Sequence, residues 1–89
     1  MGTSSGTTSA LSHGHKDVEI SARGEIFVAD IKNHRICVFS ADGARLMRSW
    51  GSIGSADGKF CMPIALSLVQ NRLFVLDEAS NSERVQVFQ

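Results

Sequence analysis

The chain has 89 residues, of which 43% are hydrophobic and 20% charged, so it is expected to form one small globular domain. Nine basic residues balance nine acidic ones, which argues against a strong electrostatic attraction to nucleic acid or an anionic membrane. No apolar run approaches the ~18 residues of a membrane-spanning helix. The two cysteines, Cys37 and Cys61, form no disulfide framework, and as free thiols they favour a reducing, intracellular compartment.

The chain divides into a tail and a patterned body. Residues 1–15 are mostly Ser, Thr, Gly and His, which predicts a disordered tail because they bury too little apolar surface to offset the entropy of ordering. The rest consists of short runs rich in Val, Ile, Leu and Phe, and these predict antiparallel β-strands. The pair Asp42-Gly43 predicts a two-residue hairpin, since Gly adopts positive φ at little cost. The predicted strands are 17–21, 25–30, 35–40, 45–51, 64–68, 72–77 and 84–89.

The body contains an internal repeat. IFVAD at 26–30 returns as LFVLD at 73–77, an offset of 47 residues, and RICVF at 35–39 returns as RVQVF at 84–88, an offset of 49. A repeat of roughly 45 residues with about four short strands is typical of a β-propeller blade. We therefore expect an all-β fold of antiparallel four-stranded blades, about two in number, as an incomplete propeller.

The repeat also predicts the division of the chain. Residues 16–62 hold the first blade and its connector, and residues 63–89 hold a truncated second blade without its last strand. The strand IFVA is apolar on both faces, so neighbours are expected to cover it on both sides. Two blades alone leave apolar faces and a strand edge exposed. We therefore expect a fragment of a larger propeller protein, or copies that self-associate.

The repeated segments resemble those of a known family. The pattern Asp30-x-x-Asn33-x-Arg35, preceded by IFV and followed by ICVF and then DG, is similar to the NHL repeat. The later GKFCMPIALSL, LFVLD and RVQVF resemble a second copy, in which an insertion displaces Asn81 and Arg84. The resemblance implies a β-propeller, commonly six-bladed, that serves as a binding platform. Such repeats end many tripartite-motif ubiquitin ligases, where they bind RNA or protein, and they also occur in sensor ectodomains and a peptide-amidating lyase.

The bend at 30–35 has two interpretations. In the first, its polar side chains, His34 included, form a reactive cluster. In the second, which we favour, Asp30 accepts backbone N–H groups, Asn33 takes the αL position of the turn, and Arg35 pairs with a carboxylate. An active site rarely recurs in every blade, so recurrence of the trio favours a structural turn motif. Its residues are Asp30, Asn33, Arg35, Asp77, Asn81 and Arg84.

Other motifs give little support to a catalytic, phosphate-binding or metal-binding role. GSIGSADGK at 51–59 lacks the spacing of a phosphate-binding loop, so it is predicted to connect the blades. HGH at 13–15 offers only two metal ligands. Cys37 stands where the second copy has Gln86, which argues against a nucleophile, and Trp50 is interpreted as packing over the outer strand.

Two classes of function remain. The first is a non-catalytic binding or scaffold module, whose bend and connector contact a protein partner, or RNA, through the candidates Lys32, His34 and Lys59. The second is an enzyme of the lyase or lactonase type with a metal at the central channel, where the inner strands offer only Asp17 and Glu19. We favour the binding module, without catalytic residues, metal or cofactor.

Overall fold

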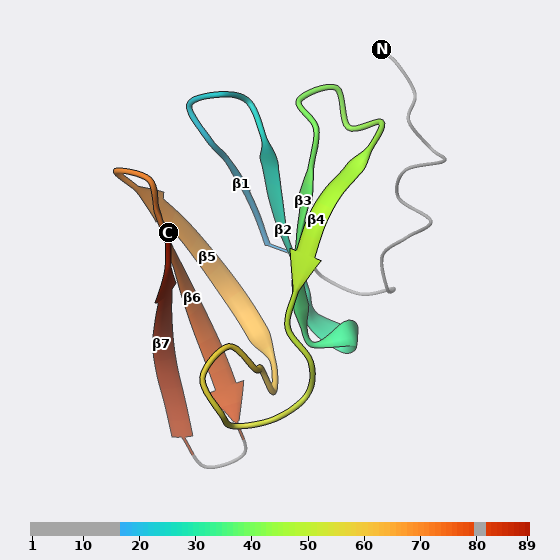
Figure 1. The fold of residues 1–89 in the computed structure, drawn as a ribbon. Helices are drawn as coiled ribbons and strands as arrows, with labels where there is room; N and C mark the ends of the chain where they lie inside the picture. The colour runs from blue at the N-terminus through green and yellow to red at the C-terminus, as the bar shows by residue number, and fades with distance from the viewer. Residues whose placement is uncertain (1–16, 80–81) are drawn as a thin grey trace.

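The computed structural model describes residues 17–79 and 82–89, which form two antiparallel sheets (Figure 1). The predicted tail and Asn81 lie outside the described residues. No helix in the described part of the chain has the length and apolar character to cross a membrane. The first sheet contains β1 (Val18–Ile20), β2 (Ile26–Asp30), β3 (Arg35–Phe39) and β4 (Leu46–Trp50), with the 3-10 turn η1 (Ile31–Asn33) between β2 and β3. The second contains β5 (Pro63–Val69), β6 (Arg72–Ala79) and β7 (Ser82–Phe88).

The seven predicted strands are confirmed, with one systematic difference. The second sheet extends β6 and β7 beyond their predicted ends, because Glu78 pairs with Glu83 and Ala79 with Ser82. The inserted residues therefore lengthen the hairpin and leave the strand register behind them unchanged.

The register is the same in both sheets. The first apolar residue in the second strand of each unit lies opposite a phenylalanine, and the aspartate four residues later lies opposite an arginine. These pairs are Ile26–Phe39 and Asp30–Arg35 in the first sheet, and Leu73–Phe88 and Asp77–Arg84 in the second. The sequence repeat is therefore also a structural repeat of strand pairing.

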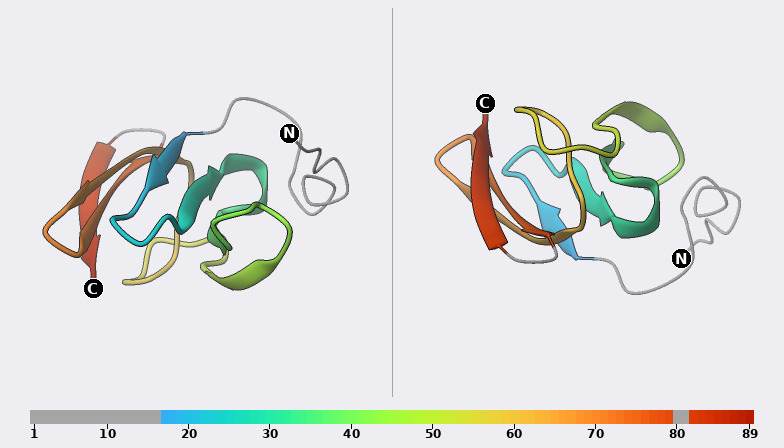
Figure 2. Two further views of the ribbon diagram at one scale, coloured as in Figure 1. Left: turned by 90° about the horizontal axis from the view of Figure 1, so that it is seen from above. Right: turned by 90° about the horizontal axis from the view of Figure 1, so that it is seen from below.

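The core lies between the facing surfaces of the two sheets, and β1 lies next to β5 (Figure 2). Phe60, from the connector between the sheets, is completely buried within it. On the other face of the first sheet, Val28, Cys37 and Phe39 form a second buried cluster, so β2 is buried on both of its faces. The core residues are Phe27, Ala29, Ile36, Val38, Phe60, Leu66, Leu73 and Val75.

The prediction of a two-residue hairpin at Asp42-Gly43 is wrong. Ser40 N donates to the carbonyl of Arg45, so four residues form this loop, and only Gly43 within it has positive φ, 74°. The carboxylate of Asp42 accepts a hydrogen bond from Ser40 Oγ, which is the main cause of its lowered pKa. That bond holds the longer turn, because an Asp side chain caps its own turn without needing positive φ.

A two-residue hairpin does join β5 and β6. Val69 pairs with Arg72, which leaves Gln70 and Asn71 as the loop, with φ of 50° and 67°. Positive φ at both central positions is the geometry of a type I′ turn, whose twist matches the flanking strands.

We predict that Gly51→Ala destabilises the chain more than Gly43→Ala. Both glycines have positive φ, which costs an Ala about 1–2 kcal/mol. A Cβ on Gly51 would lie 2.7 Å from the Phe60 ring and 2.8 Å from the carbonyl oxygen of His34, whereas one on Gly43 meets no atom within 4 Å. Crowding of this kind costs a further ~1–3 kcal/mol. Urea unfolding followed by Trp50 fluorescence measures the difference, and equal losses would contradict the close approach at Gly51.

Candidate functional site

The bend between β2 and β3 is a short 3-10 turn closed by a left-handed residue. His34 N donates to the carbonyl of Ile31 at 3.1 Å, and His34 itself has φ 56° and ψ 44°. The sequence assigned this αL position to Asn33, and that assignment is wrong. Asn33 lies within the helical turn, where its Nδ2 donates to Asp30 Oδ2 at 3.0 Å.

Asp30 is a completely buried carboxylate that compensates its charge locally. Its Oδ2 accepts from Arg35 Nε at 2.9 Å as well as from Asn33. The Arg35 side chain keeps 26% of its surface exposed, so the cation reaches solvent while its Nε stays on the acid. The geometry is that of a turn whose polar side chains bind one another.

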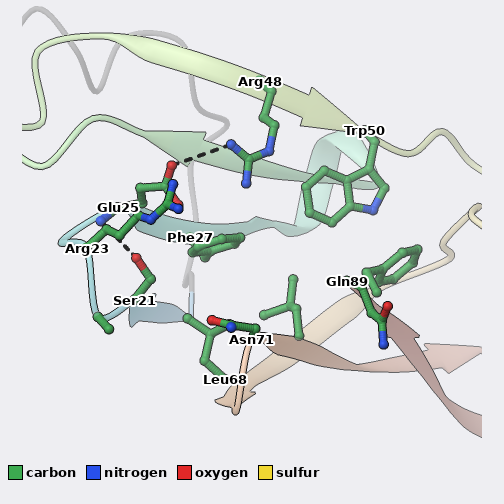
Figure 3. Close-up of a pocket in the computed structure, with 12 residues that line it drawn as sticks. Ser21, Arg23, Glu25, Phe27, Arg48, Trp50, Leu68, Asn71 and Gln89 are labelled. Carbon is green, nitrogen blue, oxygen red and sulfur yellow. Dashed lines mark hydrogen bonds and ion pairs between the residues drawn. The ribbon is translucent and has the colours of Figure 1, made fainter.

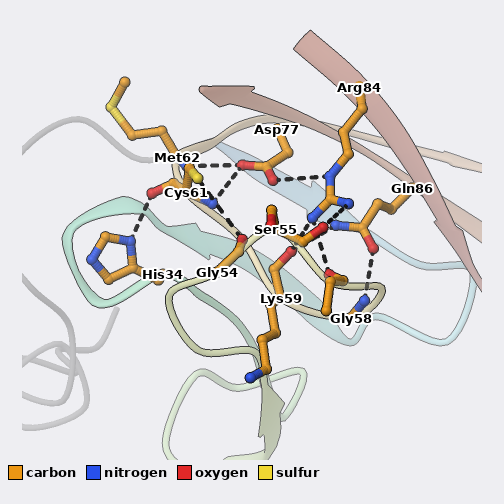
Figure 4. Close-up of polar contacts among 11 residues, drawn as sticks. His34, Gly54, Ser55, Gly58, Lys59, Cys61, Met62, Asp77, Arg84 and Gln86 are labelled. Carbon is orange, nitrogen blue, oxygen red and sulfur yellow. Dashed lines mark hydrogen bonds and ion pairs between the residues drawn. The ribbon is translucent and has the colours of Figure 1, made fainter. Parts of the chain in front are cut away.

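Asp77 holds the corresponding place in the second sheet and ties the connector to it (Figure 4). Its Oδ1 accepts backbone N–H bonds from Cys61 at 2.9 Å and Met62 at 2.8 Å. Its Oδ2 is 3.4 Å from Arg84 Nε. One buried carboxylate thus joins the chain that enters β5 to the arginine of β7.

The connector at 51–62 wraps around Arg84 and Gln86 (Figure 4). The Arg84 guanidinium donates to the carbonyl oxygens of Ser55, Ala56 and Lys59 at 2.7, 3.1 and 2.6 Å. Gln86 Nε2 donates to the same Lys59 carbonyl at 2.9 Å, and Gln86 Oε1 accepts from Gly58 N at 2.8 Å. This clasp was missed from the sequence, where only the matching position of Cys37 and Gln86 was noted.

The three predicted contact residues differ in their surroundings. Lys32 and Lys59 are exposed, and the Lys59 side chain points away from the clasp (Figure 4). His34 is half-buried, with Nδ1 2.6 Å from the carbonyl oxygen of Cys61, so its ring joins the bend to the connector. Two apolar side chains of the connector are also exposed, Ile53 at 67% and Met62 at 40%. We refer to Lys32, Ile53, Lys59 and Met62 together as the connector face.

Asp17 and Glu19, the candidate channel ligands, bind backbone of the other sheet. Asp17 Oδ2 accepts the N–H of Leu66 at 2.5 Å, and Glu19 Oε1 accepts that of Leu68 at 2.9 Å. Side chains two apart on a strand share a face, so the pair matches two alternate N–H groups on the free edge of β5. Among the described residues no group of three or more His, Cys, Asp or Glu is placed to hold a metal ion.

A cavity of about 410 Å³ opens between the sheets, beside the β1–β2 and β5–β6 turns (Figure 3). At its mouth, Arg48 lies 5.7 Å from the centre of the Phe27 ring and 3.6 Å from the Glu25 carboxylate. Deeper in, Trp50 packs against Phe88 with ring centroids 5.3 Å apart. The walls combine apolar with polar and charged side chains, and the lining residues place no nucleophile beside a base.

The chain is similar to Protein brain tumor of Drosophila melanogaster. The two are 31% identical over 72 residues, a match that covers 80% of this chain. It covers only 7% of the length of that protein. No protein-family model matches the chain.

We predict that Asp77→Ala lowers the free energy of unfolding by about 3 kcal/mol, because two backbone N–H groups and Arg84 lose their acceptor. Asp77→Asn keeps an acceptor oxygen and should cost less. Asp57→Ala, an exposed acid of the same connector, should change little. Urea titration of the three variants gives the order, and equal stability of Asp77→Ala and Asp57→Ala would refute the role of Asp77 in holding the connector.

We also predict different reactivity for the two thiols. Burial raises the pKa of Cys37, an effect that Arg35 partly opposes, so this thiol is both inaccessible and poorly ionised. Cys61 is half-buried. In the folded chain, iodoacetamide at mildly alkaline pH should alkylate Cys61 well before Cys37, and urea should abolish the difference. Peptide mass mapping reads both sites; equal rates without urea would mean that Cys37 is open to solvent.

Proposed function

We propose that the chain is part of an NHL-type β-propeller and serves as a non-catalytic module that binds a protein partner. The repeated strand register of the two sheets supports the blade assignment. The similarity to Protein brain tumor is compatible with it. On this proposal further blades complete the ring in a longer protein, where a tripartite-motif ubiquitin ligase would use such a module to select its substrate.

The observation that carries the non-catalytic role is the use of the polar residues at both bends. Asp30 accepts hydrogen bonds from side chains of its own bend, and Asp77 accepts them from the backbone of the connector. The enzyme alternative, of the lyase or lactonase type, requires Asp17 and Glu19 as metal ligands at a central channel. Both already accept an N–H from β5, which favours a structural use of these carboxylates.

The connector face has the composition of a small protein-binding site. Ile53 and Met62 offer exposed apolar surface on the connector, and Lys59 of the connector and Lys32 of the bend add positive charge. Apolar anchors with a polar rim are typical of protein interfaces. The lysines favour an acidic partner segment, since complementary charge guides association. RNA is the second class of partner, and it is less favoured because phosphate backbones are usually bound by more extended basic surfaces.

We predict that peptides selected on the immobilised chain from a random displayed library are acidic and bind at the connector face. The double variant Lys32→Glu/Lys59→Glu should weaken the selected peptides by at least about tenfold, as measured by calorimetry. The matched control is Arg45→Glu, an exposed residue next to the β3–β4 turn at the other end of the first sheet (Figure 1).

Three results would contradict the proposal. Equal weakening by Arg45→Glu would mean that binding follows net charge rather than the connector face. Retention of random single-stranded RNA, lost in the double lysine variant, would assign the partner to RNA. Stoichiometric calcium or zinc after gel filtration of the chain would favour the enzyme alternative.

A further inference from the structure

The tetrapeptide Ser-Ala-Asp-Gly occurs twice in the chain, at 40–43 and at 55–58. An aspartate that precedes a glycine can rearrange without an enzyme, because glycine has no side chain to shield its backbone nitrogen. Both aspartates, Asp42 and Asp57, are exposed. Since the two sites share the same local sequence, a difference in their reactivity reports a difference in their folded surroundings.

The rearrangement requires a free glycine nitrogen and a neutral aspartic acid. The nitrogen attacks Cγ of the acid, the new N–C bond closes a five-membered succinimide, and the carboxyl OH leaves with the amide hydrogen as water. Water then opens the ring. Attack at Cγ restores the aspartate, whereas attack at the main-chain carbonyl carbon gives an isoaspartate, whose backbone runs through Cβ and Cγ. Hydrogen bonds that hold the glycine N–H, or that keep the carboxylate ionised, therefore slow the reaction.

At Asp42 both reacting groups are held. Gly43 N donates to the carbonyl of Ser40 at 2.8 Å. Asp42 Oδ1 accepts from Ser40 Oγ at 2.6 Å and from Ala44 N at 3.0 Å. Because these bonds favour the ionised carboxylate, they lower the pKa of Asp42 and make the neutral acid scarce.

At Asp57 only the glycine nitrogen is held. Lys59 N donates to the carbonyl of Ala56 at 3.0 Å, which closes a β-turn in which Gly58 has φ 80°. Gly58 N donates to Gln86 Oε1 at 2.8 Å (Figure 4). Within the part of the chain that the structure describes, no hydrogen bond or ion pair holds the Asp57 carboxylate. What restrains this site is therefore one side chain from β7.

We propose that Asp57 is a site of spontaneous isoaspartate formation in the folded chain, and that the Gln86 amide controls its rate. The reaction needs no reagent except water. The product has one more methylene in the backbone of the turn, two residues before Lys59. The Lys59 carbonyl accepts from Arg84 at 2.6 Å and from Gln86 at 2.9 Å, so the longer backbone weakens the clasp. This inference rests on the clasp and is independent of the proposed binding function.

The test compares the two sites within one chain. After prolonged incubation at mildly acidic pH, peptide mapping separates the aspartyl and isoaspartyl peptides, which have equal mass, and electron-transfer fragmentation assigns them. In the folded wild-type chain Asp57 should isomerise at least about fivefold faster than Asp42, a ratio that one hydrogen bond on the carboxylate can supply. In urea the two rates should converge, because the tetrapeptides are identical.

Two variants separate the restraints, and each is the control for the other. Gln86→Met has a side chain of similar length without a strong acceptor, so it should speed isomerisation of Asp57 at least about fivefold and leave Asp42 unchanged. Ser40→Ala should speed isomerisation of Asp42 and leave Asp57 unchanged. Urea unfolding followed by Trp50 fluorescence establishes that each variant is folded.

The wild-type comparison does not depend on either variant. Isomerisation of Asp42 that is as fast as that of Asp57 in the folded wild-type chain overturns the proposal. So does an unchanged rate at Asp57 in Gln86→Met. Equal acceleration of both sites by Gln86→Met would also overturn it, because the cause would then be general loosening of the chain.

Discussion

A buried aspartate in the second strand of each sheet determines how that sheet is joined to what surrounds it. A carboxylate that is almost or completely removed from water must be compensated by a cation and by hydrogen bonds. Asp30 finds both within its own bend, in Arg35 and Asn33. Asp77 finds its cation on β7 and its hydrogen bonds in the connector. Each carboxylate therefore binds the arginine of the neighbouring strand and holds an adjoining loop.

The arrangement of the loops follows from this anchoring. Arg84 and Gln86 hold the backbone carbonyls of the connector, and the buried side chain of Phe60 fixes it to the core. Ile53 and Lys59 are not needed for these contacts, and both are exposed on a loop with a defined course. Binding residues on a loop positioned by a rigid scaffold are a common arrangement in proteins.

Much of the fold was predictable because the information is local and repeated. Apolar residues at every position of IFVA predicted a strand covered on both faces, and the two clusters around Phe27 and Val28 agree with this. The predictions that failed concern the details of two turns. The αL residue is His34 because the 3-10 turn ends one residue later than the sequence suggested, and the loop at Asp42 is longer because its side chain caps the turn.

The site was less predictable because its contacts join distant parts of the chain. The clasp depends on backbone carbonyl oxygens. Every residue type has one, so no residue pattern marks the clasp in the sequence. The sequence marks Asp17 and Glu19 only as acids of an inner strand, because the backbone N–H groups that they bind belong to β5, 49 residues away. A carboxylate on a strand looks the same in sequence whether it faces a metal, water or a neighbouring backbone.

The carboxylates of Asp17, just before β1, and Glu19, within it, also bear on the way the chain is made. An unpaired strand edge invites pairing with other chains, and here two acidic side chains occupy part of the edge of β5 without adding a strand to it. Since proteins emerge from the ribosome amino end first, Asp17 and Glu19 are synthesised well before the edge that they cover. The two carboxylates are therefore present when the β5 edge is made. A chain without its first strand would leave this edge open to pairing with other chains.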